Sequence, residues 1–178
     1  LTTSRKSLYK VLYEKYLSFD GEILFDHNLI NIDFSINSLY FSNKKNYRFK
    51  HIAACDGIKS SCQNLSSGTI KGPVYSGYSV WRSLLPTNQK NINFYLGANF
   101  HIVTYPIGMN QSSFVAAIKT KTELNESWRQ KGDYDDLRSE LPSSIIDEFP
   151  SLKQSNQIYK WGVFTRPLPN ALFDKNIT

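Results

Sequence analysis

Four segments that favour β-strands follow one another between residues 77 and 120. They read GYSVWRSLL, NFYLG, NFHIVTYPIG and SSFVAAIKT, and they are rich in aromatic and β-branched residues. Gly, Pro, Asn and Ser gather in the short stretches between them, where turns are expected. Strands joined by such short turns pair in the antiparallel direction. We therefore predict an antiparallel sheet that has one covered face and one open face.

Helices and a further strand are predicted on either side of this sheet. Residues 4–22 carry apolar side chains at helical spacing, with Ser4 or Thr3 as the cap and Asp20-Gly21 at the end. The apolar residues concerned are Leu8, Val11, Leu12 and Tyr16. After the sheet comes an acidic helical stretch, in which Pro142 opens a second helix, and then the strand IYKWGVFTRPL.

The region between the first helix and the sheet predicts a smaller β-structure. LINIDFSI alternates apolar and polar residues, which predicts one shared face for Ile30, Ile32, Phe34 and Ile36. SLYFSN and YRFKHIAAC flank the polar turn NKKN and predict a hairpin, followed by a turn and a short helix at DGIKSSCQN. The predicted fold class is therefore α+β.

The composition is typical of a folded domain. Of the 178 residues, 40% are hydrophobic, which is enough to build a core. No window approaches about eighteen apolar residues, and the opening LTTSRKSLYK has no apolar signal-peptide core, so we expect no stable membrane insertion. The net charge of +6 comes mostly from scattered Lys residues. Because a nucleic-acid footprint requires clustered charge, we interpret Lys44 and Lys45 as a solvated turn and expect no nucleic-acid partner.

The two cysteines, Cys55 and Cys62, lie in the stretch ACDGIKSSC. Their spacing is not CxxC and no His pair lies nearby, so we predict no metal site. Two cysteines cannot form a disulfide framework for a domain of this size. We therefore expect a reducing, cytoplasmic setting.

The sequence has no GxGxxG or P-loop glycine pattern and no GxSxG or HExxH motif. Three other places stand out. Asp56-Gly57 follows a strand and begins a turn into a helix, whose first amides favour an anion, although such turns are also common as purely structural features. The other two are YSGYSVWRSLLP, which contains Trp81 and Arg82, and NFHIVTYPIG.

In NFHIVTYPIG, His101 and Tyr105 are four residues apart. On a strand they face the same side, about 13 Å apart along the chain, with Val103 between them. A His and a Tyr that face a pocket can act as a base and a hydrogen-bond donor toward a phenol. The structural alternative is a partly buried, hydrogen-bonded His and a core Tyr.

Six motifs, taken in order, resemble the flavoprotein aromatic hydroxylases, most closely the salicylate hydroxylase-like branch with the para-hydroxybenzoate hydroxylase fold. SRKSLYKVL resembles the family's Arg-x-x-Leu helix, ACDGIKSSC resembles GADGxxSxxR, and YSGYSVWRSLLP resembles YTGYxAWRGLxP, the most specific match. FHIVTYPIG resembles HxxxYPxxxG, ESWRQKGDYDDLRSEL resembles SWxxxGDxxEL, and YKWGVFTRPLP resembles the strand before GDAAH. The resemblance covers nearly the whole chain.

The resemblance implies an FAD- and NAD(P)H-dependent monooxygenase, an oxidoreductase, that hydroxylates a small carboxylated or phenolic aromatic substrate. It also implies an internal fragment that is inactive and does not retain FAD by itself, because the family's N-terminal GxGxxG and C-terminal Gly-Asp motifs do not occur here. We expect a partial FAD-binding lobe over residues 1–70 and a substrate-binding sheet with helices over 71–165. Residues 166–178 would return toward the FAD-binding domain.

The resemblance further implies catalytic and cofactor-binding residues. His101 and Tyr105 would face the substrate ring, and in several relatives the His deprotonates a substrate phenol. Arg5 would contact the flavin phosphate or ribityl region. Asp56 and Gly57 would lie near the FAD pyrophosphate and the path of NAD(P)H. The flavin would perform the oxygen chemistry, while the protein supplies orientation and a dry pocket.

The implied substrate-binding residues are Trp81, Arg82 and Pro106. Arg82 would hold a substrate carboxylate through two parallel hydrogen bonds. Its alternative role is to stack on Trp81 or on a neighbouring Tyr and bridge the sheet to a helix. Pro106 would turn the chain beside the flavin.

The chain departs from the family's pattern at several places. The family's turn usually carries an Arg after its Ser, and here Ser61 and Gln63 occupy those places. Which residues would contact the phosphate or the nicotinamide is therefore left open. Ser83 stands where the family usually has a Gly after Trp-Arg. A related halogenase is one alternative, but its WxWxIP motif does not occur. Another is a truncated, non-catalytic binding domain that self-associates through exposed apolar patches, for example as a homodimer.

Overall fold

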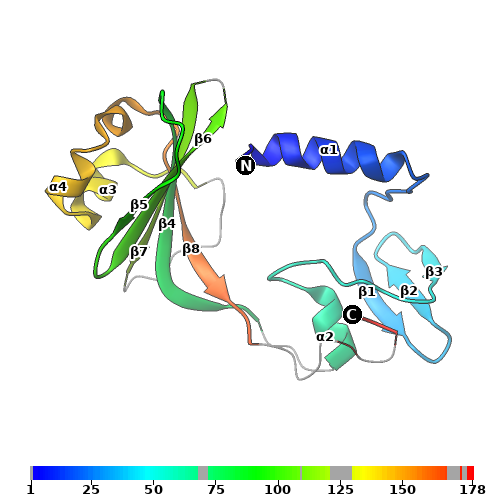
Figure 1. Ribbon diagram of the computed structural model, residues 1–178. Coiled ribbons are helices and arrows are strands. Elements are labelled where there is room, and N and C mark those ends of the chain that lie inside the picture. The colour runs from blue at the N-terminus through cyan, green and yellow to red at the C-terminus, as the bar shows by residue number, and fades with distance from the viewer. Residues whose placement is uncertain (1, 68–71, 109, 121–129, 168–172, 174–175) are drawn as a thin grey trace. The chain divides into compact units, whose positions relative to one another are not determined.

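The computed structural model describes residues 2–67, 72–108, 110–120, 130–167, 173 and 176–178 (Figure 1). The chain divides into two compact units. One unit comprises Leu1–Asp20 and Tyr75–Val163, and the other comprises Gly21–Val74 and Phe164–Thr178. Residues 1–20 group with the sheet and not with residues 21–74. The expected division into an FAD-binding lobe and a substrate-binding sheet, with borders at 70/71 and 165/166, stays a prediction.

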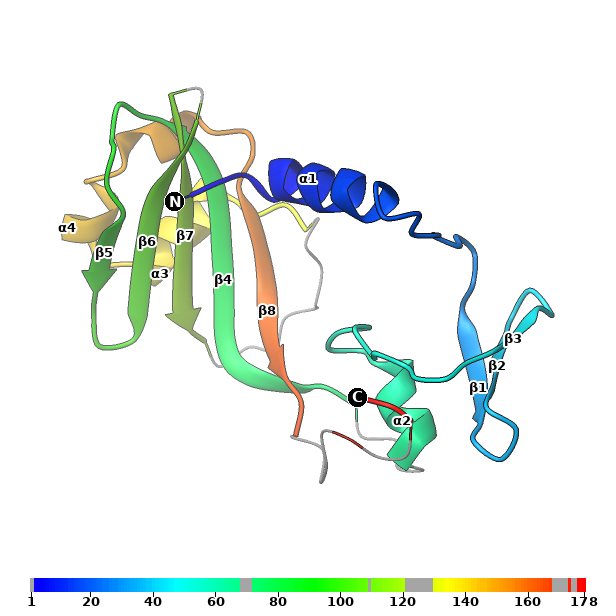
Figure 2. The same cartoon turned by 45° about the vertical axis from the view of Figure 1, so that its right-hand side comes forward.

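The first unit is built on a five-stranded sheet in the order β5-β6-β7-β4-β8 (Figure 2). The strands are β4 (Val74–Pro86), β5 (Asn93–Leu96), β6 (Phe100–Gly108), β7 (Gln111–Lys119) and β8 (Tyr159–Thr165). The pairs β5–β6, β6–β7 and β4–β7 are antiparallel. The predicted sheet and the α+β class are therefore confirmed.

One face of this sheet is covered, because alternate side chains of its central strands are buried against helices. The buried cluster contains Trp81, Leu85, Ile102, Phe114, Ala116 and Ile118 from the strands, and Leu137, Leu141, Ile146 and Leu152 from the helical region. The residues between these buried ones point to the opposite side of the sheet, which we call the open face. It carries Val80, Arg82 and Leu84 of β4 together with His101, Val103 and Tyr105 of β6.

Three short helices cover the buried face (Figure 1). They are α3 (Tyr134–Glu140), α4 (Ser143–Ile146) and the 3-10 helix η1 (Pro150–Gln154). The side chain of Asp133 caps α3 by accepting a hydrogen bond from the amide of Asp135. Pro142 stands at the cap position of α4, where its missing amide hydrogen is not needed. Part of the motif ESWRQKGDYDDLRSEL, residues 126–129, lies outside the described residues.

The second unit contains a three-stranded antiparallel sheet and one short helix. Its elements are β1 (Leu29–Asp33), β2 (Ser38–Phe41), β3 (Asn46–Arg48) and α2 (Ser61–Ser67), and the strand order is β1-β2-β3. The predicted hairpin and short helix are confirmed. The C-terminal segment joins this unit, because the backbone of Ile52 bonds to Asn176 and Thr178 at 2.8 and 2.9 Å in a parallel bridge with Ile177.

The predicted alternation of LINIDFSI, which covers β1 and the turn after it, is wrong at two of its four residues. The pairing register shifts between Leu29 and Asn31, so Ile32 is buried while Ile30 is 54% exposed. An extra residue in one strand sends the side chains on either side of it to opposite faces. Ile36 is 48% exposed because it lies in the turn before Asn37, whose φ is 51°.

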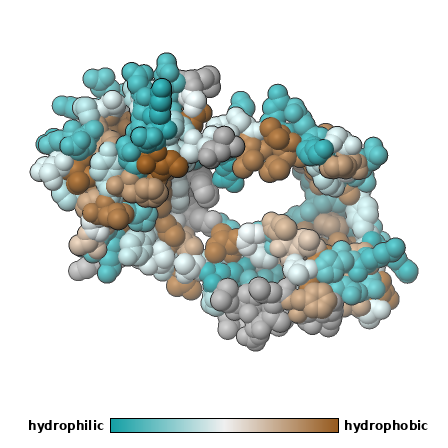
Figure 3. Space-filling model, in the orientation of Figure 1, coloured by the Kyte–Doolittle hydropathy of each residue, from teal (hydrophilic) through white to brown (hydrophobic). Residues whose placement is uncertain are grey.

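Helix α1 (Arg5–Leu17) begins as predicted at Ser4, whose hydroxyl accepts a hydrogen bond from the amide of Ser7 at 3.1 Å. It has no buried residue. The side chains predicted to form its packing face, Leu8, Val11, Leu12 and Tyr16, are 47 to 62% exposed. Figure 3 shows apolar surface along this helix. Neither α1 nor any other helix in the described part of the chain is long and apolar enough to cross a bilayer.

Candidate functional site

The open face of the five-stranded sheet brings together three of the predicted site residues. His101 is exposed, and Tyr105 and Arg82 are half-buried. His101 and Tyr105 share this face because strand side chains alternate, as predicted. Within the described residues, none of the three side chains forms a hydrogen bond or an ion pair, so their polar groups are available to a ligand.

The strand register gives their arrangement. Val115 of β7 pairs with Arg82 on one side and with Val103 on the other. Val103 is the midpoint between His101 and Tyr105, so Arg82 lies opposite the middle of that pair, two strands away. Since neighbouring strands are about 4.8 Å apart, the β4 and β6 backbones are about 10 Å apart at this row.

The floor between these residues is made of small side chains. On the open face, β7 contributes Ser113, Val115 and Ala117, which pair with both β4 and β6. Val115 and Ala117 are short and half-buried, whereas Ser113 is fully buried between its strand partners Leu84 and Tyr105. The accessible part of this face, around Val115 and Ala117, suits a flat, largely apolar ligand with polar groups at its edges.

A pocket of about 160 Å³ adjoins Arg82 on the β8 side. It is lined by Arg82, Ser83, Leu84, Gln157, Tyr159 and Trp161. Tyr159 and Trp161 were not predicted as site residues from the sequence. The alternation of side chains along β8 could have predicted them, because it places Tyr159 and Trp161 on the face of the strand opposite Lys160.

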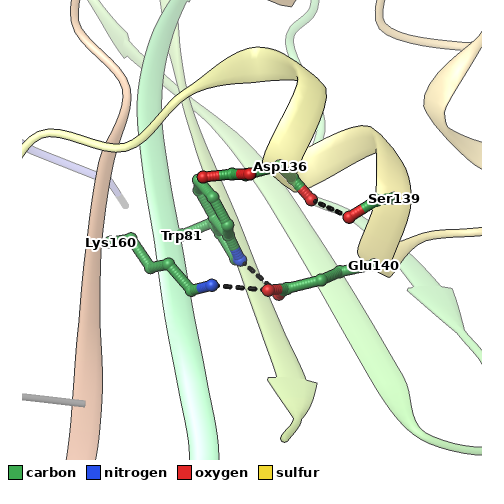
Figure 4. Close-up of polar contacts among 5 residues, drawn as sticks. All are labelled: Trp81, Asp136, Ser139, Glu140 and Lys160. Carbon is green, nitrogen blue, oxygen red and sulfur yellow. Dashed lines mark hydrogen bonds and ion pairs between the residues drawn. The ribbon is translucent and has the colours of Figure 1, made fainter. Parts of the chain in front are cut away.

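Trp81 does not share this face, and the expectation that it binds substrate is corrected. Its side chain is fully buried under the helices, and its indole nitrogen donates to Glu140 at 2.8 Å. Lys160 forms an ion pair with Glu140 at 2.5 Å and lies 4.5 Å from the Trp81 ring centroid (Figure 4). Adjacent strand residues point to opposite faces, so the cation that stacks on Trp81 is Lys160 and not Arg82.

Pro106 also differs from its expected role of turning the chain. Strand β6 continues through Pro106, and the turn comes afterwards, at Gly108 and Asn110, whose φ values are 92° and 53°. Pro106 is half-buried and its carbonyl accepts a hydrogen bond from the hydroxyl of Thr2. It lines a separate pocket of about 330 Å³ with residues 87–90.

Asp56 and Gly57 lie in the second unit, in a tightly bonded turn before α2. The carboxylate of Asp56 accepts a hydrogen bond from the amide of Cys62 at 2.9 Å. Partial burial tends to raise the pKa of Asp56, but hydrogen bonds from Cys62 and Ser60 outweigh it and leave this pKa below its ordinary value. Gly57 has a φ of 74° and open space where a side chain would lie, which favours glycine there.

Arg166, which was not predicted as a site residue from the sequence, holds this turn. Its guanidinium donates to the carbonyls of Ile58 and Ser60 at 3.2 and 3.1 Å and to the side chain of Asn64. Because one guanidinium from a segment far along the chain bonds to three acceptors, it fixes the backbone of the turn before α2. Arg5, the other predicted cofactor contact, is exposed in the first turn of α1.

Comparison with known proteins finds matches among solved structures. No family model matches this sequence. No curated protein matches it either. The structure of HpxO from Klebsiella pneumoniae, complexed with FAD and uric acid, matches 98% of this chain with a TM-score of 0.75 and 14% identity. A salicylate hydroxylase substrate complex matches 97% with a TM-score of 0.69 and 18% identity, and CtdE in complex with FAD and a substrate matches 94% with a TM-score of 0.76 and 15% identity.

The chain spans about half the length of these structures, since it covers 46, 48 and 47% of them respectively. At such low sequence identity the likeness shows the fold alone. That fold is the one seen in FAD complexes and in a hydroxylase. It confirms the fold that the sequence resemblance implies, that of the flavin-dependent hydroxylases.

Proposed function

We propose that this chain belongs to an FAD- and NAD(P)H-dependent monooxygenase that hydroxylates a small aromatic substrate carrying a phenol or a carboxylate. The observation that supports this most is the group His101, Tyr105 and Arg82 around a small-residue floor, in a fold shared with FAD complexes. The free thiols of Cys55 and Cys62 fit a cytoplasmic enzyme. We propose that activity requires more of the protein than these 178 residues, because the matched structures are about twice as long.

FAD would supply the oxygen-transfer chemistry when bound. The chain's own residues would bind the aromatic ring over Val103 and Val115 and orient it. The exposed imidazole of His101 would take the proton from a substrate phenol, which makes the ring more nucleophilic. Tyr105 would donate a hydrogen bond to the substrate, and Arg82 would pair with its carboxylate.

Three residues fit contacts to FAD. Arg5 is an exposed cation that suits a phosphate. Gly57 leaves space for a ligand to approach the backbone closely. Asp56 stays charged at neutral pH because its pKa is lowered. As an anion it would accept a hydrogen bond from a ribose hydroxyl, whereas the negative pyrophosphate would repel it.

The test is made on the whole protein. It should contain flavin, oxidise NADH or NADPH, and hydroxylate a panel of phenols and benzoates. His101→Ala should lower hydroxylation at least about 100-fold, as expected for loss of a general base, while FAD stays bound. His27→Ala, a histidine in the other unit, is the control and should keep full activity. Unchanged turnover of His101→Ala would remove His101 from the mechanism.

Flavin binding by the 178-residue chain itself is a separate measurement. Titration with FAD, followed by visible absorbance, should show no saturable binding if the remaining parts of the protein are needed. Saturable binding would contradict the proposal that this chain needs them, and would leave the monooxygenase assignment intact.

A second candidate function is a non-catalytic domain that associates with itself. The exposed apolar side chains of α1 favour it, because a helix without a buried residue is seldom stable in isolation. This function predicts a dimer that forms without flavin or substrate.

A further inference from the structure

The pocket next to Arg82 lies on the side of β4 that faces away from His101. Its lining comes from β4 and from β8 with the residues just before it, and β8 is the neighbour of β4 on the side opposite β7. His101 and Tyr105 are on β6, beyond β7. A ligand that fills this pocket and also reaches His101 must therefore extend over both β4 and β7.

The pocket has the chemistry of an anion site. Arg82 is its one charged lining residue, and the described residues give its guanidinium no hydrogen-bond or ion-pair partner. A half-buried guanidinium has lost part of its hydration, so an anion that enters the pocket can stabilise it as a counter-ion. The pocket adjoins a second one of about 320 Å³, which shares Leu84 and Gln157 with it and is lined by neutral side chains. No lining carboxylate in either pocket competes for the arginine.

The remaining walls suit an aromatic ring. Tyr159 and Trp161 supply apolar ring surface, and Leu84 supplies an aliphatic side. The amide of Gln157 and the hydroxyl of Tyr159 can add hydrogen bonds beside the guanidinium. A planar carboxylate joined to a ring matches this combination of groups.

The length of the ligand follows from the register. The rows of His101 and Arg82 differ by two residues, which is about 7 Å along the strands. Together with the about 10 Å across the strands, this sets the two backbone positions about 12 Å apart. A single-ring hydroxybenzoate is too short to place its carboxylate in the pocket and its phenol at His101. A second ring, or a spacer of similar length, closes the gap.

We propose that this pocket is the anion subsite of the substrate site and selects extended aryl acids, in which a second ring separates the carboxylate from the ring that reacts. The inference rests on the proposed function for the role of His101. It narrows the substrate class from small aromatic compounds in general to acids of about two rings. Arg82 and Trp161 are then the residues that set specificity.

The experiment measures ligand binding by the 178-residue chain, without flavin, by isothermal titration calorimetry. The probes are 4′-hydroxybiphenyl-4-carboxylate, its methyl ester and 4-hydroxybenzoate. The biphenyl acid should bind at least about tenfold more tightly than the ester, because a hydrogen-bonded charge is removed. It should also bind at least about tenfold more tightly than 4-hydroxybenzoate, which lacks the second ring.

Variants assign this preference to the pocket. Arg82→Gln should remove the advantage of the acid over its ester, and Arg82→Lys should keep part of it. Arg48→Gln, an exposed arginine on β3 in the other unit, is the matched control and should leave all three affinities unchanged. Circular dichroism checks that each variant is folded, and the ester comparison needs no substitution at all.

The inference is overturned if the acid and its ester bind equally, or if 4-hydroxybenzoate binds as tightly as the biphenyl acid. An acid preference that survives in Arg82→Gln also overturns it. Because this assay contains no flavin, a whole protein that fails to hydroxylate would contradict the proposed function and not the subsite. A whole protein that hydroxylates 4-hydroxybenzoate best would contradict the subsite alone.

Discussion

Asp56 and Cys62 form a coupled pair at the turn before α2. Burial, and then the charge of Asp56, raise the pKa of the Cys62 thiol to about 11. Burial acts to raise the pKa of Asp56, but the hydrogen bonds that Cys62 and Ser60 donate to this carboxyl outweigh burial and lower its pKa. The folded state therefore keeps a charged carboxylate beside a neutral thiol. Cys55, seven residues earlier, is exposed.

We predict that thiol labelling at pH 8 modifies Cys55 rapidly and Cys62 slowly in the native chain. Labelling of Cys62 should rise with pH toward a midpoint near 11. Asp56→Asn removes the charge and should move this midpoint down, whereas Asp33→Asn, bonded to Ser35, should not. Mass spectrometry of the labelled peptides measures both rates, and equal labelling of the two cysteines would contradict the prediction.

The same shift has a consequence for stability. An unfolded Cys62 loses its proton near its ordinary pKa of 9.0, while the folded one keeps it up to about 11. Its contribution to the free energy of unfolding is thus fully present below pH 9 and is lost as the pH rises toward 11.

At the scale of elements, the polar cluster of Trp81, Glu140 and Lys160 ties α3 to the sheet. Glu140 closes the last turn of α3, Trp81 is in β4, and Lys160 is in β8. The side chains of Lys160 and Glu140 are only 16 and 24% exposed, so water screens their ion pair only weakly. Gly132 packs against the same ring, since a side-chain carbon there would lie 2.5 Å from Trp81.

We predict that Glu140→Ala lowers the free energy of unfolding by about 1–3 kcal/mol, because it leaves the buried indole N–H and the Lys160 ammonium without an acceptor. Glu140→Gln retains an oxygen acceptor for the indole and should cost less. Urea unfolding measures the difference, with the exposed Glu148→Ala as the control. Equal midpoints for the two alanine variants would show that the cluster does not stabilise the fold.

At the scale of the whole molecule, the amount of apolar surface left exposed is unusual. Seven apolar or aromatic side chains of α1 and its end are 43 to 71% exposed, and Phe94 and Leu96 of β5 are 66 and 79% exposed. Surfaces of this kind mark contacts with other protein parts or other chains.

We predict that the purified 178-residue chain associates with itself as its concentration rises, because contact between copies would bury the α1 side chains. Replacing Val11 and Leu12 together by Lys should shift the equilibrium toward the monomer. Replacing the already polar Lys10 and Glu14 by Gln is the control. Sedimentation equilibrium measures the association, and a monomer at every concentration would exclude α1 as a self-association surface.

Local sequence patterns were enough to predict the class and order of the elements. The strands of the sheet, the Ser4 cap and the shared face of His101 and Tyr105 all follow from local rules, namely the period of two in strands and the chemistry of caps and turns. The motif order was sufficient to predict the flavin-hydroxylase fold, because each motif lies within one element or one turn.

Local patterns did not predict which residues lie together in space, because long-range packing selects those contacts. The register shift at Leu29 exposed Ile30, and no local pattern marks where a bulge falls. Trp81 and Arg82 are adjacent in sequence, yet helix packing on one face made Trp81 a core residue and left Arg82 in the site. Trp161 lines one pocket with Arg82, and Arg166 bonds to the Asp56 turn, across more than 75 residues of chain in each case. Such pairings depend on how strands and segments pack, and the energy that selects them is spread over the whole fold.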